Sequence, residues 1–119
     1  MRAFRELKIW QKSHQLVLDV YIATREFPRE EMYGLTSQIR RAASSVPANI
    51  AEGCGRNSTP DFPRFLHMAA GSASELEYHL ELARDLGLLE PPTYGQLETQ
   101  VTEVKRMLSA FTAKLKADC

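Results

Sequence analysis

The feature that most constrains this chain is an apolar spacing of three and four residues that recurs in four separate segments. In an α-helix this spacing places the apolar side chains on one face, whereas a β-strand requires strict alternation, which the chain nowhere sustains. The four stripes are Ile9, Leu16, Val20, Ala23 and Phe27; Leu35, Ile39, Ala42, Ala43, Val46 and Ile50; Phe62, Leu66, Ala69, Ala73, Leu76, Leu80 and Ala83; and Leu97, Val101, Val104, Leu108, Phe111 and Leu115. The chain is therefore predicted to be all-α.

Prolines and glycines mark where the predicted helices end. Pro28 stops the first helix, Gly53 is a candidate C-terminal cap for the second, and Pro91-Pro92 follow the third. Helices are expected over about residues 5–27, 32–53, 60–87 and 93–117. Because the connections are short, consecutive helices should be antiparallel neighbours. Residues 1–119 are thus predicted to form one domain, an antiparallel up-down four-helix bundle.

The charge balance argues against two classes of protein. The net charge is +0 and 25% of the residues are charged, which disfavours both a disordered chain and a simple polybasic nucleic-acid binder. The charges are unevenly distributed, because residues 1–27 carry a net +2 and residues 60–90 a net −4. The acidic third quarter is therefore a candidate surface for a basic partner.

The chain shows no feature of a secreted or membrane protein. Residues 1–15 carry several charges and lack a continuous apolar stretch, so no signal peptide is expected. No run approaches the roughly 20 apolar residues needed to cross a bilayer. Cys54 and Cys119 suggest two thiols in a reducing compartment and no disulfide framework. A cytoplasmic protein with no membrane partner is expected.

Residue types that carry catalysis or bind metals are present but do not form a recognisable site. Cys54 lies between two glycines, where it is expected in an exposed loop, and has no histidine near it to activate the thiol. Glu75 and His79 are four residues apart, but the Glu-x-x-His pattern of di-iron bundles is absent. His14 and His67 are expected to be half-buried packing residues. The sequence thus predicts no enzyme, no metal and no cofactor.

Arg40-Arg41 is the strongest candidate for a functional site. The flanking Ile39 and Ala42–Ala43 belong to the apolar stripe, so the arginines should lie at the outer edge of the second helix. Arginines in that position can contact phosphate groups, and Arg56 in the following loop is a candidate third member. No aromatic residue is interleaved with them, so stacking on nucleic-acid bases is not expected. A solvated or subunit-bridging face is the alternative interpretation.

One long motif makes the chain more specific than a generic bundle. Residues Tyr33–Gly53 read YGLTSQIRRAASSVPANIAEG, and Phe4–Lys12 read FRELKIWQK. Together with Phe65-Leu66, Ala70-Gly71-Ser72 and Glu75-Leu76-Glu77, these residues resemble the signature of a bacterial four-helix bundle family. That family is named for proteins encoded in intervening sequences of 23S ribosomal RNA genes. Pro63 departs from the family pattern, which usually has a good helix former there.

The resemblance implies a four-helix bundle that assembles into a homopentamer with a central channel. A related branch, the accessory proteins of diversity-generating retroelements, is similar in fold, works with a reverse transcriptase and binds nucleic acid through basic surfaces. By the same resemblance, Arg40, Arg41 and Arg56 stand at the family's basic positions. No molecular activity is generally established for the stand-alone members.

Two hypotheses follow. The first is a non-enzymatic, homo-oligomeric accessory protein that binds RNA or DNA through Arg40, Arg41 and Arg56. The second is a structural or adaptor module that binds only itself and another protein, without nucleic acid. Charge neutrality and the acidic residues 60–90 favour the second hypothesis, and the paired arginines favour the first.

Overall fold

The computed structural model describes residues 3–56 and 61–117, and every regular element within them is helical. In chain order these elements are η1 (Phe4–Glu6), α1 (Lys8–Thr24), η2 (Arg29–Glu31), α2 (Leu35–Gly55), α3 (Asp61–Asp85) and α4 (Pro91–Ala117), where η marks a short 3-10 helix. The predicted all-α fold with four helices is confirmed.

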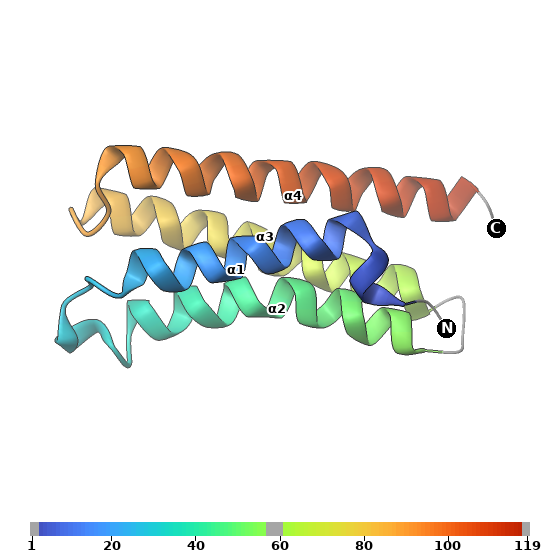
Figure 1. Cartoon of the computed structure of the whole chain (residues 1–119), viewed down its shortest axis with the longest axis horizontal. Coiled ribbons are helices and arrows are strands. Elements are labelled where there is room, and N and C mark those ends of the chain that lie inside the picture. The colour runs from blue at the N-terminus through green and yellow to red at the C-terminus, as the bar shows by residue number, and fades with distance from the viewer. Residues whose placement is uncertain (1–2, 57–60, 118–119) are drawn as a thin grey trace.

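The four α-helices lie side by side, and consecutive helices run in opposite directions (Figure 1). Each packs against two neighbours, in the cyclic order α1, α2, α3, α4 and back to α1. The molecule is elongated, with extents of 46 × 23 × 20 Å. The α1–α2 and α3–α4 connections lie at the same end of the molecule (Figure 1). Within the described residues, no helix combines the length and the apolar character needed to cross a bilayer.

The helix ends differ from the predicted boundaries for local reasons. The predicted start at residue 5 is too early, because Phe4–Glu6 form a separate 3-10 turn before α1. The predicted start at residue 93 is too late, because Pro91 opens α4, where a proline has no backbone N–H to satisfy. Pro63 is accommodated in the first turn of α3 for the same reason.

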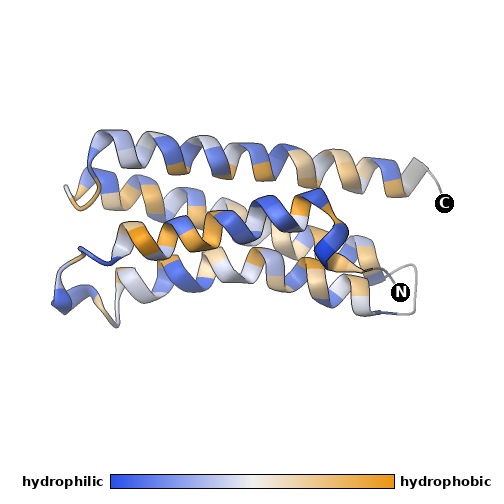
Figure 2. Cartoon of the chain, in the orientation of Figure 1, coloured by the Kyte–Doolittle hydropathy of each residue, from blue (hydrophilic) through white to orange (hydrophobic). Residues whose placement is uncertain are grey.

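The predicted apolar stripes form the core. Figure 2 shows hydrophobic and hydrophilic residues in alternating bands along each helix, as one buried face per helix requires. Three of the four helices contribute their stripes almost in full, whereas the last residues of the α4 stripe are only partly buried. The largest side chains with less than 2% of their surface exposed are Ile9, Leu16, Val20, Ile39, Val46, Ile50, Leu66, Leu76, Leu80, Leu97, Val101 and Leu108.

Gly53 is a packing glycine and not the helix cap expected from the sequence. The helix continues to Gly55, and Arg56 is the residue that caps it. A Cβ placed on Gly53 would lie 2.8 Å from Phe62 Cδ1 and 3.1 Å from Phe65 Cβ, so only glycine lets α2 approach α3 this closely. The extra helical turn also carries Cys54 into the core with 2% exposure, which corrects the expectation of an exposed loop thiol.

A glycine turn ends α3 and fixes the start of the connection to α4. Gly87 has a φ of +77°, and its N–H donates to the Arg84 carbonyl at 2.9 Å. The Leu88 N–H donates to the Ala83 carbonyl at 2.9 Å, which completes a Schellman motif. Nearby, the hydrogen bond from Arg84 to Asp85 raises the pKa of that guanidinium above its ordinary value. After the turn, Leu89 is buried in the core and Leu88 packs against it.

Candidate nucleic-acid interface

Arg40 is held in place by contacts with α1. Its Nε donates to Thr24 Oγ1 at 2.9 Å, and its guanidinium carbon lies 4.6 Å from the centroid of the Tyr21 ring. Thr24 is 3% exposed, and its own hydroxyl donates to the Val20 carbonyl at 2.9 Å. The Arg40 side chain is therefore oriented in advance, and no ion pair with a carboxylate engages it among the described residues.

Arg41 lies beside Arg40 and is exposed to solvent. It too forms no ion pair within residues 3–56 and 61–117. Both arginines line an open groove of about 380 Å³ between α2, α1 and the connection between these two helices. We call this groove the arginine groove; its lining residues are Tyr21, Met32, Tyr33, Thr36, Ser37, Arg40, Arg41 and Ser44.

The arginine groove also contains aromatic rings and an unpaired hydroxyl. Tyr33 is 97% exposed and Tyr21 is 41% exposed, so both can meet a ligand in the groove. Thr36 is only 2% exposed, and its Oγ1 has no hydrogen-bond partner in the described part of the chain. Two guanidinium groups and two phenol rings suit a ligand that carries both anionic and flat aromatic groups, whereas the Thr36 hydroxyl is buried beneath them.

Arg56 is not part of this groove. It lies 16 residues after Arg40 on the same helix, which corresponds to about 24 Å at 1.5 Å per residue. Its Nε is 3.7 Å from Glu52 Oε2, and its guanidinium carbon is 5.1 Å from the Phe65 ring centroid. Arg56, the third predicted site residue, therefore lies far from Arg40 and Arg41 in the structure.

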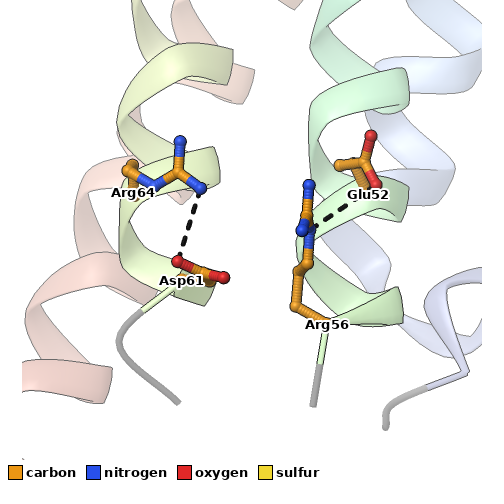
Figure 3. A network of polar contacts seen from close by, with 4 residues as sticks. All are labelled: Glu52, Arg56, Asp61 and Arg64. Carbon is orange, nitrogen blue, oxygen red and sulfur yellow. Dashed lines mark hydrogen bonds and ion pairs between the residues drawn. The ribbon is translucent and has the colours of Figure 1, made fainter. Parts of the chain in front are cut away.

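A second arginine faces Arg56 across the ends of α2 and α3, as Figure 3 shows. Arg64 Nη2 is 3.3 Å from Asp61 Oδ1, and its guanidinium carbon is 4.6 Å from the same Phe65 ring. Each arginine of this cluster thus has a carboxylate beside it. The cluster is electrically balanced, whereas the arginine groove is not.

Two lysines have carboxylates opposite them on neighbouring helices. Lys105 Nζ lies 2.8 Å from Glu77 Oε1, which joins α4 to α3. Lys12 Nζ lies 3.6 Å from Glu103 Oε1, which joins α1 to α4. Because these charges are paired inside the molecule, they are weaker candidates for binding phosphate than Arg40 and Arg41.

The histidines do not combine into a site among the described residues. His79 Nε2 lies 3.3 Å from Glu75 Oε2, but no group of three or more metal-ligating side chains forms there. His14 stacks on Trp10 with centroids 4.8 Å apart and yet remains exposed, and His67 is exposed as well. The expectation that His14 and His67 are half-buried is therefore wrong.

Tyr21 and Thr24 were not recognised as site residues in the sequence. Tyr21 lies 19 positions before Arg40 and belongs to a different helix. Aromatic residues are indeed absent around the arginines in the sequence, but packing of α1 against α2 places Tyr21 under Arg40. No local pattern reveals such a pair, because the contact depends on how two helices align.

Comparisons with known proteins agree with this fold. The family model described as "23S rRNA-intervening sequence protein" matches residues 5–110. A solved structure from Bacteroides thetaiotaomicron VPI-5482, described as a protein with unknown function from the S23 ribosomal protein family, superposes with a TM-score of 0.79 at 26% identity. The match covers 87% of this chain and 97% of that one. No curated protein matches the chain. The chain therefore belongs to the 23S rRNA-intervening sequence protein family.

Proposed function

We propose that this chain is a non-enzymatic, self-associating accessory protein that binds RNA or DNA through the arginine groove. The observation that carries the proposal is the pair Arg40 and Arg41, which have no carboxylate partner among the described residues while the other arginine pair, Arg56 and Arg64, is balanced. Phosphate groups would bind to the guanidinium groups, and a base would stack on Tyr33.

The two arginines have different roles in this proposal. Arg40 is fixed by Thr24 and Tyr21, so it loses little side-chain freedom when it binds a phosphate. Arg41 is exposed and adds charge without helping to hold the fold. Arg41 is therefore the better position for a charge-reversal test, because Arg40→Glu would also break the contact between α1 and α2.

The test is fluorescence anisotropy of a labelled structured RNA titrated with the protein over a series of salt concentrations. Structured RNA is the first probe because the family takes its description from 23S rRNA. The wild-type protein should bind at low salt, and its affinity should fall with a log–log slope of about 0.7–0.9 per phosphate contacted. Arg41→Glu should weaken binding by at least about tenfold at low salt.

The matched control is Arg106→Glu, which makes the same charge change at an exposed position on α4. It should leave the affinity within about twofold of wild type, because the long-range charge effect is screened by salt. Absence of RNA binding at low salt would contradict the proposal. Equal losses in the two variants would show that only the overall charge matters and that the groove is not the site.

Self-association is the second part of the proposal. Three large apolar side chains on α3 and directly after it are exposed: Met68 is 46% exposed, Tyr78 59% and Leu86 58%. In the proposed oligomer, another copy of the chain covers Tyr78. We expect sedimentation velocity to show a pentamer, and Tyr78→Glu to shift the distribution toward monomer. A monomeric wild-type protein at tens of micromolar would rule this part out.

The alternative function is an adaptor that binds proteins and no nucleic acid. Among the acidic residues that suggested it, Glu77 is paired with a cation from outside residues 60–90, Lys105. Asp61 is paired with Arg64, which the net charge of −4 already includes, so most of that negative charge is left for a partner. The RNA titration decides between the two functions, since an adaptor of this kind gives no salt-dependent RNA binding.

A further inference from the structure

A second groove lies on the other side of α1 from the arginine groove. It is formed by the C-terminal half of α1, the α3–α4 connection and the first turns of α4, and its volume is about 330 Å³. Both grooves are at the end of the molecule where the α1–α2 and α3–α4 connections lie (Figure 1). We call this second groove the acidic groove; the residues that matter here are Asp19, Ile22, Glu26, Leu88, Leu89 and Glu90.

The acidic groove has an apolar base that extends to the surface. Leu89 and Leu97 line it and are 6% and 1% exposed, whereas Ile22 is 55% exposed at its edge. Leu18, one turn before Ile22, is 44% exposed and continues the apolar surface along α1. Figure 2 shows that the half of α1 next to these connections is the more hydrophobic half. An apolar side chain of a partner would therefore be sheltered from water here.

Three carboxylates line the groove around this base. Asp19 comes from α1, Glu26 from the connection that follows α1 and Glu90 from the α3–α4 connection, and none of them pairs with a lysine or arginine in the described parts of the chain. This contrasts with Glu77 and Asp61, whose cations are in contact. The groove therefore combines apolar surface with negative charge that the fold does not neutralise.

The carboxylate of Asp19 is held in position by amides on two helices. Gln15 Nε2 on α1 donates to its Oδ1 at 3.1 Å, and Gln100 Nε2 on α4 donates to its Oδ2 at 2.9 Å. Neutral amides fix the geometry of the carboxylate without cancelling its charge. At the opposite wall, the Gly87 turn fixes the backbone of Leu88, and the Leu89 side chain is buried in the core. The groove is formed before any partner arrives, which lowers the entropic penalty of binding.

The chemistry of the groove indicates its occupant. No group of three or more metal-ligating side chains comes together among the described residues, so the carboxylates are too dispersed for a single metal ion and suit several separate positive charges. The chain's own exposed apolar pair, Met32 and Tyr33, directly follows Glu30 and Glu31, which the acidic groove would repel. A second copy of this chain therefore fits poorly through that segment.

We propose that the acidic groove binds a cationic segment of a partner protein, in which one aliphatic side chain packs against Ile22 and Leu88 while flanking lysines or arginines face Asp19, Glu26 and Glu90. This goes beyond nucleic-acid binding, because it uses the opposite flank of α1. The protein then holds a nucleic acid on one side of α1 and a basic protein on the other.

The test is fluorescence anisotropy with a labelled peptide that has one leucine between two pairs of lysines. Ile22→Ser and the double variant Glu26→Gln/Glu90→Gln should each weaken binding by at least about fivefold, because one removes the apolar contact and the other the charge. Replacing the leucine of the peptide by serine should weaken its binding to wild type similarly. The matched control Glu6→Gln/Glu81→Gln removes two exposed carboxylates outside the groove and should change affinity by less than about twofold.

Each contrary result has a distinct meaning. Equal weakening by the groove variant and the control would show general attraction to negative charge and would overturn the proposal. Loss of self-association by the groove variant in sedimentation velocity, with no peptide bound to wild type, would make a second copy the occupant and would also overturn it. RNA affinity of the Glu26→Gln/Glu90→Gln variant should stay at the wild-type value, so a failure here is separable from a failure of the RNA-binding proposal.

Discussion

Arg40 on α2 and Thr24 on α1 are joined by a hydrogen bond of 2.9 Å from Nε to Oγ1. The Thr24 hydroxyl has a single proton, and that proton is directed to the Val20 carbonyl, so its oxygen is free to accept from the arginine. The bond uses only one of the five N–H groups of the guanidinium. Thr24 thus orients Arg40 toward the arginine groove and leaves most of its donors available to a phosphate.

Thr24→Val should weaken RNA binding while the fold is kept. The valine has the shape of threonine but cannot accept from Arg40 Nε, so the guanidinium gains freedom that binding must then remove. We expect RNA affinity to fall by about threefold to tenfold and the free energy of unfolding by about 0.5–1.5 kcal/mol. Anisotropy at low salt and urea unfolding measure the two quantities.

Thr112→Val is the control for this prediction. Thr112 is also buried on a helix, and its hydroxyl donates to the Leu108 carbonyl at 2.8 Å, but it has no contact with Arg40. This variant should lose similar stability and keep its RNA affinity. If both variants lose affinity equally, the loss reflects stability and Thr24 does not position Arg40.

Gly53→Ala should destabilise the protein. The added methyl group would lie 2.8 Å from Phe62 Cδ1, so α2 and α3 must separate or the ring must move. Overpacking of this kind costs about 1–3 kcal/mol, measured by urea unfolding. Gly71→Ala on α3 is the control, because its Cβ meets no atom within 4 Å, and it should stabilise by about 0.5–1 kcal/mol. If Gly53→Ala and Gly71→Ala changed the free energy of unfolding by the same amount, the close approach of α2 to α3 at Gly53 would be contradicted.

Gly87→Ala should destabilise the end of α3 through the backbone. Gly87 has a φ of +77°, where a Cβ costs roughly 1–2 kcal/mol even though the space around it is empty. Gly95→Ala lies within α4, meets no neighbouring atom, and should be neutral or stabilising. Thermal unfolding followed by circular dichroism compares the two. A neutral Gly87→Ala would show that the left-handed turn is not required.

Cys54 should resist thiol reagents until the protein unfolds. It is 2% exposed, so the reagent reaches it only when α2 separates from its neighbours. In a Cys119→Ser background, labelling with an aromatic disulfide should be slower than in denaturant by at least about a hundredfold. Rapid labelling of the native protein would show that the last turn of α2 opens readily.

The sequence predicts the helices better than the candidate site, and particular residues show why. Leu66, Ala69 and Ala73 repeat at helical spacing, and all three are buried where the stripe places them. The sequence predicts that the second helix ends at Gly53 and that Cys54 lies in a loop, because glycine-rich stretches usually are loops. In the structure they complete α2, since the close approach of Phe62 and Phe65 stabilises a helical turn that local propensity disfavours.

The sequence by itself determined that this chain forms four helices with one apolar face each, because the three-four spacing is a property of neighbouring residues. It also singled out Arg40 and Arg41. Only the tertiary structure decided that Tyr21 lies under Arg40. It likewise decided that Asp19, Glu26 and Glu90 share a groove. These relationships depend on how whole helices align along one another, which the spacing within any single helix does not encode.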